Sequence, residues 1–110
     1  MRLSEAIIEG AKLRPQSKLD YFVRVGREVH SCALGSAYEG ATGKGPGVRW
    51  PVINKFVWQQ FGATLNRRVK GPRRGDSLDS VGKHIVSLNF RWDRERIAEW
   101  VRTVEESEAA

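Results

Sequence analysis

Two stripes of apolar residues at helical spacing constrain the fold of this chain more than any other feature. The first stripe comprises Leu78, Val81, Ile85 and Leu88. The second comprises Ile97, Trp100, Val101 and Val104, and charged residues occupy the opposite positions. Short helices persist only when such stripes are buried, because an isolated short helix is unstable in water. The stripes therefore predict a C-terminal αα-hairpin that turns at Trp92-Asp93, with Asp76 or Ser77 capping its first helix and Asp93 its second.

The rest of the chain predicts further helices and one small β-hairpin. Helices are expected over residues 4–13, 31–39 and 51–65, with Pro51 in the first turn of the third. Residues 21–25 are β-branched and aromatic, which favours a strand, and residues 27–30 would supply its partner. We therefore predict a mainly α-helical fold with a short β-hairpin near residues 21–30.

Chain length limits how these elements are organised. With 110 residues the chain fits a single domain, 1–110, and leaves no room for two independent cores. Flexible loops are expected near residues 40–49 and 66–76, where Gly and Pro are dense, and the tail 105–110 is expected to fray.

The sequence also predicts a cytoplasmic protein that does not contact a membrane. No uncharged stretch reaches the ~18 residues that a membrane span needs. The first residues lack the charge pattern of a secretory signal, because Glu5 and Glu9 bracket a short apolar run. Cys32 is the single cysteine, so no internal disulfide can form, which agrees with a reducing compartment.

Basic residues are concentrated in the middle of the chain. The whole chain has a net charge of +6, but residues 41–75 hold eight Lys and Arg and no acidic residue. Five of these cations fall within residues 66–75. A surface of one sign attracts polyanions, so this segment predicts a negatively charged partner.

Nucleic acid is the partner that this pattern favours. The candidate contacts are Arg67, Arg68, Lys70, Arg73 and Arg74 in the basic loop, with Lys44 and Arg49 upstream. Cations neutralise phosphates, and exposed aromatic side chains stack on bases. The interleaved aromatic residues are Trp50, Phe56, Trp58 and Phe61, which we expect to lie in the core. The predicted function is non-catalytic binding of DNA or RNA through the basic loop, with no cofactor.

Two alternatives stay open on the residues alone. The same basic loop suits an acidic surface on a host protein, which would make the chain a protein-binding regulator or inhibitor. Residues 78–104 also match the outline of a helix-turn-helix, in which Arg94, Glu95 and Arg96 at the start of the second helix would contact bases. The long apolar stripe fits a plain helical hairpin better.

Motifs for nucleotide or metal binding are weak. Residues 40–45 resemble a phosphate-binding loop, but the glycine spacing is wrong and Gly45 stands where that motif needs Ser or Thr. His30, Cys32 and His84 are too scattered for a four-ligand zinc site. We expect Cys32 to be a buried structural residue rather than a nucleophile.

Paired carboxylates that could act as a general acid and base are also scarce. Glu95 and Glu99 lie four residues apart on a predicted helix, beside Arg96 and Arg102. That arrangement favours surface ion pairs over catalysis. Because no Ser-His-Asp pattern stands out either, we do not expect an enzyme.

Two segments carry a resemblance to known sequences. Residues 31–40 are similar to a CALGAAY-like helix, and residues 87–101 are similar to an LND…W-(S/T)-R-E-x-I-A-x-W-(V/L) ending, with Phe90 in place of the acid. Together with the opening Leu3-Ser4-Glu5-Ala6-Ile7, they resemble small proteins of phages and prophage regions. The matched pieces cover roughly a third of the chain. The resemblance implies a phage-type origin, with action in the host cytoplasm, rather than a particular activity.

Overall fold

Helices dominate the chain, and two short β-hairpins interrupt them. The computed structural model describes residues 1–109, with side chains through Ser107. Its helices are α1 (Leu3–Ala11), α2 (Ala33–Thr42), α3 (Trp50–Gln60), α4 (Gly62–Leu65), α5 (Val81–Leu88) and α6 (Arg94–Ala109). Its antiparallel hairpins pair β1 (Phe22–Val25) with β2 (Glu28–Ser31), and β3 (Arg68–Lys70) with β4 (Leu78–Ser80). Just over half of the chain is helical, so the fold is mixed α/β rather than strictly mainly α.

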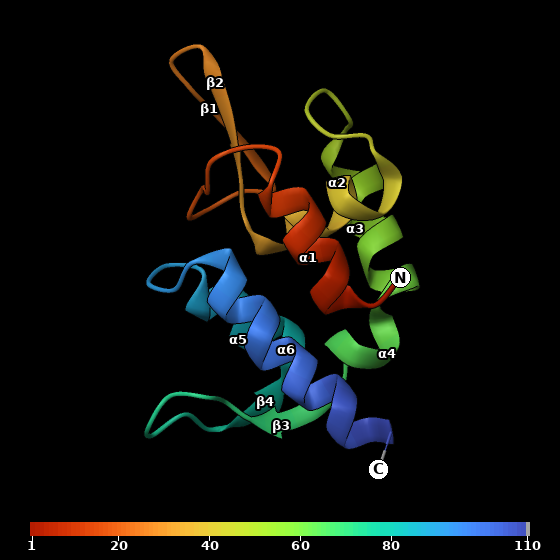
Figure 1. The fold of residues 1–110 in the computed structure, drawn as a ribbon, viewed down its shortest axis with the longest axis vertical. Coiled ribbons are helices and arrows are strands. Elements are labelled where there is room, and N and C mark those ends of the chain that lie inside the picture. The colour runs from red at the N-terminus through yellow and green to blue at the C-terminus, as the bar shows by residue number, and fades with distance from the viewer. Residues whose placement is uncertain (110) are drawn as a thin grey trace.

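The helices gather in the middle of the molecule, and the hairpins project from opposite ends. Figure 1 shows β1–β2 at the top of the view and β3–β4 at the bottom. The molecule measures 41 × 26 × 22 Å along its principal axes. Helix α1 lies against both α2 and α6, so it forms the centre of the packing. Within residues 1–109, no helix is long and apolar enough to cross a membrane.

Several sequence predictions are confirmed. The hairpin near residues 21–30 forms, with Phe22 opposite Ser31 and Val25 opposite Glu28. Pro51 lies in the first turn of α3, and the predicted helix over residues 51–65 is present except for a break at Phe61 between α3 and α4. The α6 cap is also as predicted, because the Asp93 carboxylate accepts a hydrogen bond from the Arg96 N–H at 2.7 Å.

The two apolar stripes are largely buried but pack differently from the prediction. The buried members are Val81, Ile85, Leu88, Ile97, Val101 and Val104, while Trp100 is half-buried against them. Leu78 is 59% exposed, because residues 78–80 pair with β3 and the helix begins only after Ser80, whose hydroxyl caps it. Helix α6 follows α5 after a short turn, but its main partner is α1.

The backbones of α1 and α2 touch where they cross. A Cβ on Gly10 would lie 1.8 Å from the Ser36 carbonyl oxygen, and one on Gly40 would lie 2.0 Å from the Ala6 carbonyl oxygen. Real Cβ atoms do not approach that closely, so both positions require glycine. Helix propensity alone would indicate only that Gly10 weakens the end of its helix.

The C-terminal helix is fixed to the start of α1 by a buried acid. The Glu105 carboxylate accepts hydrogen bonds from both the N–H and the hydroxyl of Ser4, in the first turn of α1. A carboxylate at that position satisfies an unpaired N–H and interacts well with the helix dipole. The tail was expected to fray from Glu105, yet α6 continues through Ala109; residue 110 lies outside the described residues.

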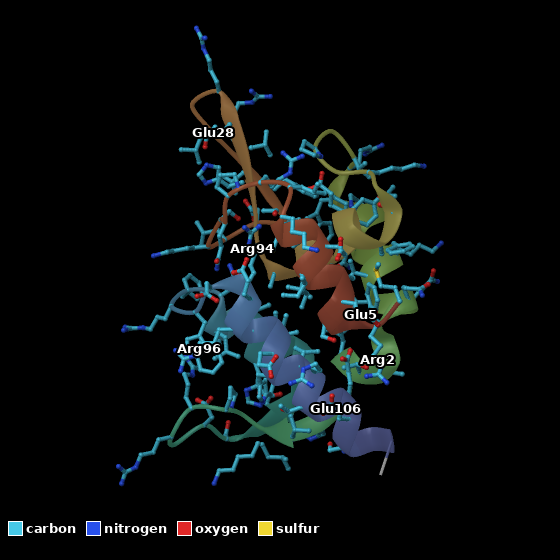
Figure 2. All side chains as sticks on the ribbon, viewed as in Figure 1. Arg2, Glu5, Glu28, Arg94, Arg96 and Glu106 are labelled. Atoms are coloured by element: carbon cyan, nitrogen blue, oxygen red, sulfur yellow. The ribbon has the colours of Figure 1, made fainter. Side chains whose placement is uncertain are left out.

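A buried arginine joins four segments of the chain, a region that we call the Arg94 junction. The Arg94 side chain is 5% exposed. Its Nη1 donates to the hydroxyls of Ser31 and Ser36 at 2.9 and 3.0 Å, and its Nη2 donates to the carbonyls of Arg14 and Ala11 at 2.7 and 3.4 Å. Figure 2 places Arg94 at the start of α6, where that helix meets α1 and the base of the β1–β2 hairpin.

Two amides extend the Arg94 junction. The Gln16 Oε1 accepts a hydrogen bond from the Arg94 N–H, and its Nε2 donates to Asn89. The buried Asn89 side chain accepts from the Ala33 N–H at the start of α2 and donates to the Ser17 carbonyl at 2.8 Å. These bonds satisfy helix ends that would otherwise be buried without partners.

Candidate nucleic-acid interface

The basic segment that we expected to be a mobile loop is a short hairpin attached to the core. Arg68 lies opposite Ser80 and Lys70 lies opposite Leu78 in the antiparallel register. The half-buried Val69 packs against the core, and its carbonyl accepts a hydrogen bond from the His84 Nε2 at 2.9 Å. The fold therefore holds this basic segment in a defined position.

Two of the five hairpin cations have structural roles. The Arg67 Nη1 donates to the Val104 carbonyl on α6 at 3.0 Å. The Arg73 Nε and backbone N–H both contact the Asp76 carboxylate, and Arg73 Nη2 reaches the Ser87 hydroxyl at 2.9 Å. Both arginines tie the hairpin to helices, and Arg73 also closes its loop.

The other three hairpin cations are exposed. The side chains of Arg68, Lys70 and Arg74 make no hydrogen bond or ion pair with any described residue. Alternate residues of a strand point to the same side, so Arg68 and Lys70 share the outer face while Val69 faces the core. We call Arg68, Lys70 and Arg74 the free cation set.

Lys44 and Arg49 do not join the free cation set. Both are exposed and lie in the connection between α2 and α3. Figure 1 shows that connection, drawn yellow-green, in the upper part of the view, whereas the β3–β4 hairpin is at the bottom. The seven predicted contact residues are thus divided between two ends of the molecule.

The start of α6 does not match a base-contacting helix. Arg94 is buried in the Arg94 junction, so it cannot reach a base. Arg96 is exposed, but its guanidinium stacks over the Trp92 ring at 3.8 Å. The helix-turn-helix alternative therefore loses Arg94, and its second proposed arginine already has a partner in Trp92.

The sulfur and imidazole groups have local structural partners. Cys32 is 8% exposed, as expected, and burial raises the pKa of its thiol. The Cys32 sulfur accepts a hydrogen bond from the Gly35 N–H at the start of α2. His30 contacts Glu28, and the His84 ring meets the Trp100 ring edge to face at 5.7 Å. On α6, Arg102 pairs with Glu99, as the sequence suggested, and it also pairs with Glu106.

The aromatic residues of the basic segment differ in exposure. Phe61 is buried, and Phe56 and Trp58 pack against the core as expected. Trp50, which we also expected in the core, is 60% exposed. It is the first residue of α3, at the end of the helix that the core does not cover. Helical spacing alone did not separate this side chain from its neighbours.

The fold and the charge distribution together define a small mixed α/β protein whose basic β3–β4 hairpin is attached to the core. Comparisons with protein-family models, with curated proteins and with solved structures give no match to this chain.

Proposed function

We propose that this chain is a small, non-catalytic, phage-type protein that binds nucleic acid in the host cytoplasm through the β3–β4 hairpin. One observation carries the proposal: Arg67 and Arg73 hold the hairpin in place, while the free cation set faces solvent. Cations that stabilise the fold need partners within it, whereas these three have none among the described residues.

The shape of the hairpin supports the proposal. A two-stranded ribbon is narrow enough to enter the major groove of a duplex, which is about 12 Å wide. Arg68 and Lys70 lie on one face, two residues apart along β3, so they can follow neighbouring phosphates. Such contacts position a protein on many sequences alike, and we therefore propose weak sequence preference.

A salt titration tests this proposal. We expect the wild-type protein to bind a fluorescein-labelled 20-base-pair duplex or an RNA of the same length at about 50 mM salt, measured by anisotropy. The triple variant R68A/K70A/R74A should bind more weakly on every sequence. On the duplex, the slope of log K against log salt should fall by about 0.9 for each lost phosphate contact.

A variant with the same change in charge separates contact from general attraction. Lys12, Arg24 and Arg27 are exposed cations outside the β3–β4 hairpin, so K12A/R24A/R27A also removes three positive charges. It should retain the wild-type slope. The proposal would be contradicted if the two triple variants lost the same amount of binding affinity. It would also be contradicted if the wild-type protein bound neither DNA nor RNA at about 50 mM salt.

A second candidate function follows from an exposed apolar strip. Leu19 and Val86 are 72% and 55% exposed and line one hollow, and Phe90 lines the next hollow beside Lys18. Apolar side chains beside Lys18 suit an acidic protein surface better than a phosphate backbone. A host-protein complex that survives nuclease and is lost in F90S would favour the protein-binding regulator.

A further inference from the structure

A hollow lies between the base of the β1–β2 hairpin and the start of α3. Its volume is about 310 Å³, the lower end of the range for small-ligand sites. The residues that line it are Asp20, Tyr21, Phe22, Val48, Trp50 and Ile53. Three of them are aromatic, one is a carboxylate, and none belongs to the β3–β4 hairpin.

The walls of this hollow suit a flat ring. The Tyr21 and Trp50 ring centroids are 6.3 Å apart and their planes are inclined by 42°. The Tyr21 hydroxyl donates to the Asn54 Oδ1 at 2.6 Å, which fixes that ring, and the buried Ile53 forms the apolar floor. The Trp50 ring remains 60% exposed, so a planar group can stack on it without displacing any protein contact.

Polar groups near the hollow complement a nucleotide. The Asp20 carboxylate makes no hydrogen bond or ion pair with any described residue, and it can only accept hydrogen bonds when ionised. It therefore favours a ring edge that offers N–H groups. Arg49 is exposed and directly precedes Trp50, and Lys44 lies in the same connection, so cations are available for a phosphate.

We infer that this hollow binds an unpaired nucleobase, with Trp50 as the stacking platform, Asp20 as acceptor for the base edge and Arg49 beside the phosphate. Guanine fits the acceptor best, because two adjacent N–H donors lie on its edge. The inference rests on the proposed function in taking nucleic acid as the partner. It adds a single-strand site at the end of the molecule opposite the β3–β4 hairpin.

Guanosine monophosphate is the probe for this site. Stacking on Trp50 should quench tryptophan fluorescence, and ribose 5-phosphate, which lacks the base, should not. W50A should weaken binding by about five- to a hundredfold, since one stacked base contributes about that much. The matched control is V52A, which removes another exposed apolar side chain of α3 outside the hollow and should bind normally.

Two further variants separate this inference from the proposed function. D20N should reduce the preference for guanosine over uridine monophosphate, because an amide can turn a donor toward the base. R68A/K70A/R74A should bind guanosine monophosphate as the wild type does, even where duplex binding is lost. The inference is overturned if ribose 5-phosphate binds as well as guanosine monophosphate, or if W50A and V52A bind the nucleotide equally well. It is also overturned if the cation tetramethylammonium binds through Trp50 while the nucleotide does not, because the hollow would then be a cation site.

Discussion

The Arg94 junction and the β3–β4 hairpin use the same side-chain chemistry for opposite purposes. In the junction, one arginine is 5% exposed and donates to four partners on separate segments. In the hairpin, Arg68, Lys70 and Arg74 face solvent without a partner among the described residues. A guanidinium has five donors, so it can satisfy several carbonyls and hydroxyls in the interior or remain available to an external anion.

This contrast shows that the count of positive charges in a segment does not reveal which of them are available. The hairpin contains five cations, but Arg67 and Arg73 belong functionally with Arg94, because each donates to atoms of another element. Burial lowers the pKa of the Arg94 guanidinium, but arginine stays charged in proteins. The junction therefore keeps a buried charge, and hydrogen bonds from its two terminal nitrogens offset part of the cost of removing it from water, while its buried Nε has no partner among the described residues.

The largest expected effect is the loss of the Arg94 junction. R94M keeps most of the side-chain volume but leaves the Ser31 and Ser36 hydroxyls and the Arg14 carbonyl without their donor. We expect the free energy of unfolding to fall by on the order of 3–5 kcal/mol in urea denaturation. R96M removes an exposed guanidinium that stacks on Trp92 and should cost about 0.5–1 kcal/mol. Equal costs would break the contrast between buried and exposed arginines.

A smaller effect is expected at Gly10, beside the same junction. G10A would drive a methyl group into the Ser36 carbonyl, and Ser36 is itself a partner of Arg94. Helix propensity alone predicts stabilisation of about 1 kcal/mol, but overpacking should reverse the sign and cost about 1–3 kcal/mol. At Gly62, a Cβ would meet only the end of the Asn66 side chain at 3.4 Å, so G62A should change the melting temperature little. A stabilised G10A would contradict the close approach of α1 and α2.

The sequence predicted those parts of the fold that depend on local signals. The α6 stripe, the Asp93 cap and the hairpin near residues 21–30 each follow from neighbouring residues. The β4 strand was missed because Leu78 fits the helical spacing of Val81 and Ile85. Its partner β3 is followed directly by Gly71 and Pro72, which indicate a loop. Strands of three residues carry too little periodicity to overcome such signals.

Prediction of the candidate site was limited by tertiary contacts. The basic segment was found from its charge, but the division between Arg67 and Arg73 on one side and the free cation set on the other depends on α5, α6 and Asp76. Asp20 and Tyr21 are distant from Trp50 in the sequence, so their shared hollow left no local pattern. The sequence signal that could have indicated Trp50 is its position directly before Pro51, at the predicted start of a helix.

The smallest expected effect is a change in the pKa of Asp76, which distinguishes the structural cation Arg73 from the free cation set within the β3–β4 hairpin. Partial burial alone would raise the pKa of Asp76, but hydrogen bonds from the Arg73 side chain and N–H lower it below its ordinary value of 3.8. An acid whose pKa is lowered by folding stabilises the fold above its ordinary pKa, and this contribution is lost as the pH falls through the lower folded value. The Asp76 contact should therefore persist at neutral pH and weaken only below about pH 3.8.

Nuclear magnetic resonance titration of the Asp76 carboxyl carbon measures this difference directly. We expect a midpoint below 3.8 in the wild type and a midpoint closer to 3.8 in R73A, which keeps the backbone N–H but loses the guanidinium. R68A removes a cation that does not contact Asp76, so its midpoint should stay near that of the wild type. If R68A moved the midpoint as far as R73A, the hairpin charges would act on Asp76 as one diffuse field. The distinction between Arg73 and the free cation set would then fail, and with it the reason for assigning phosphate contacts to Arg68, Lys70 and Arg74 alone.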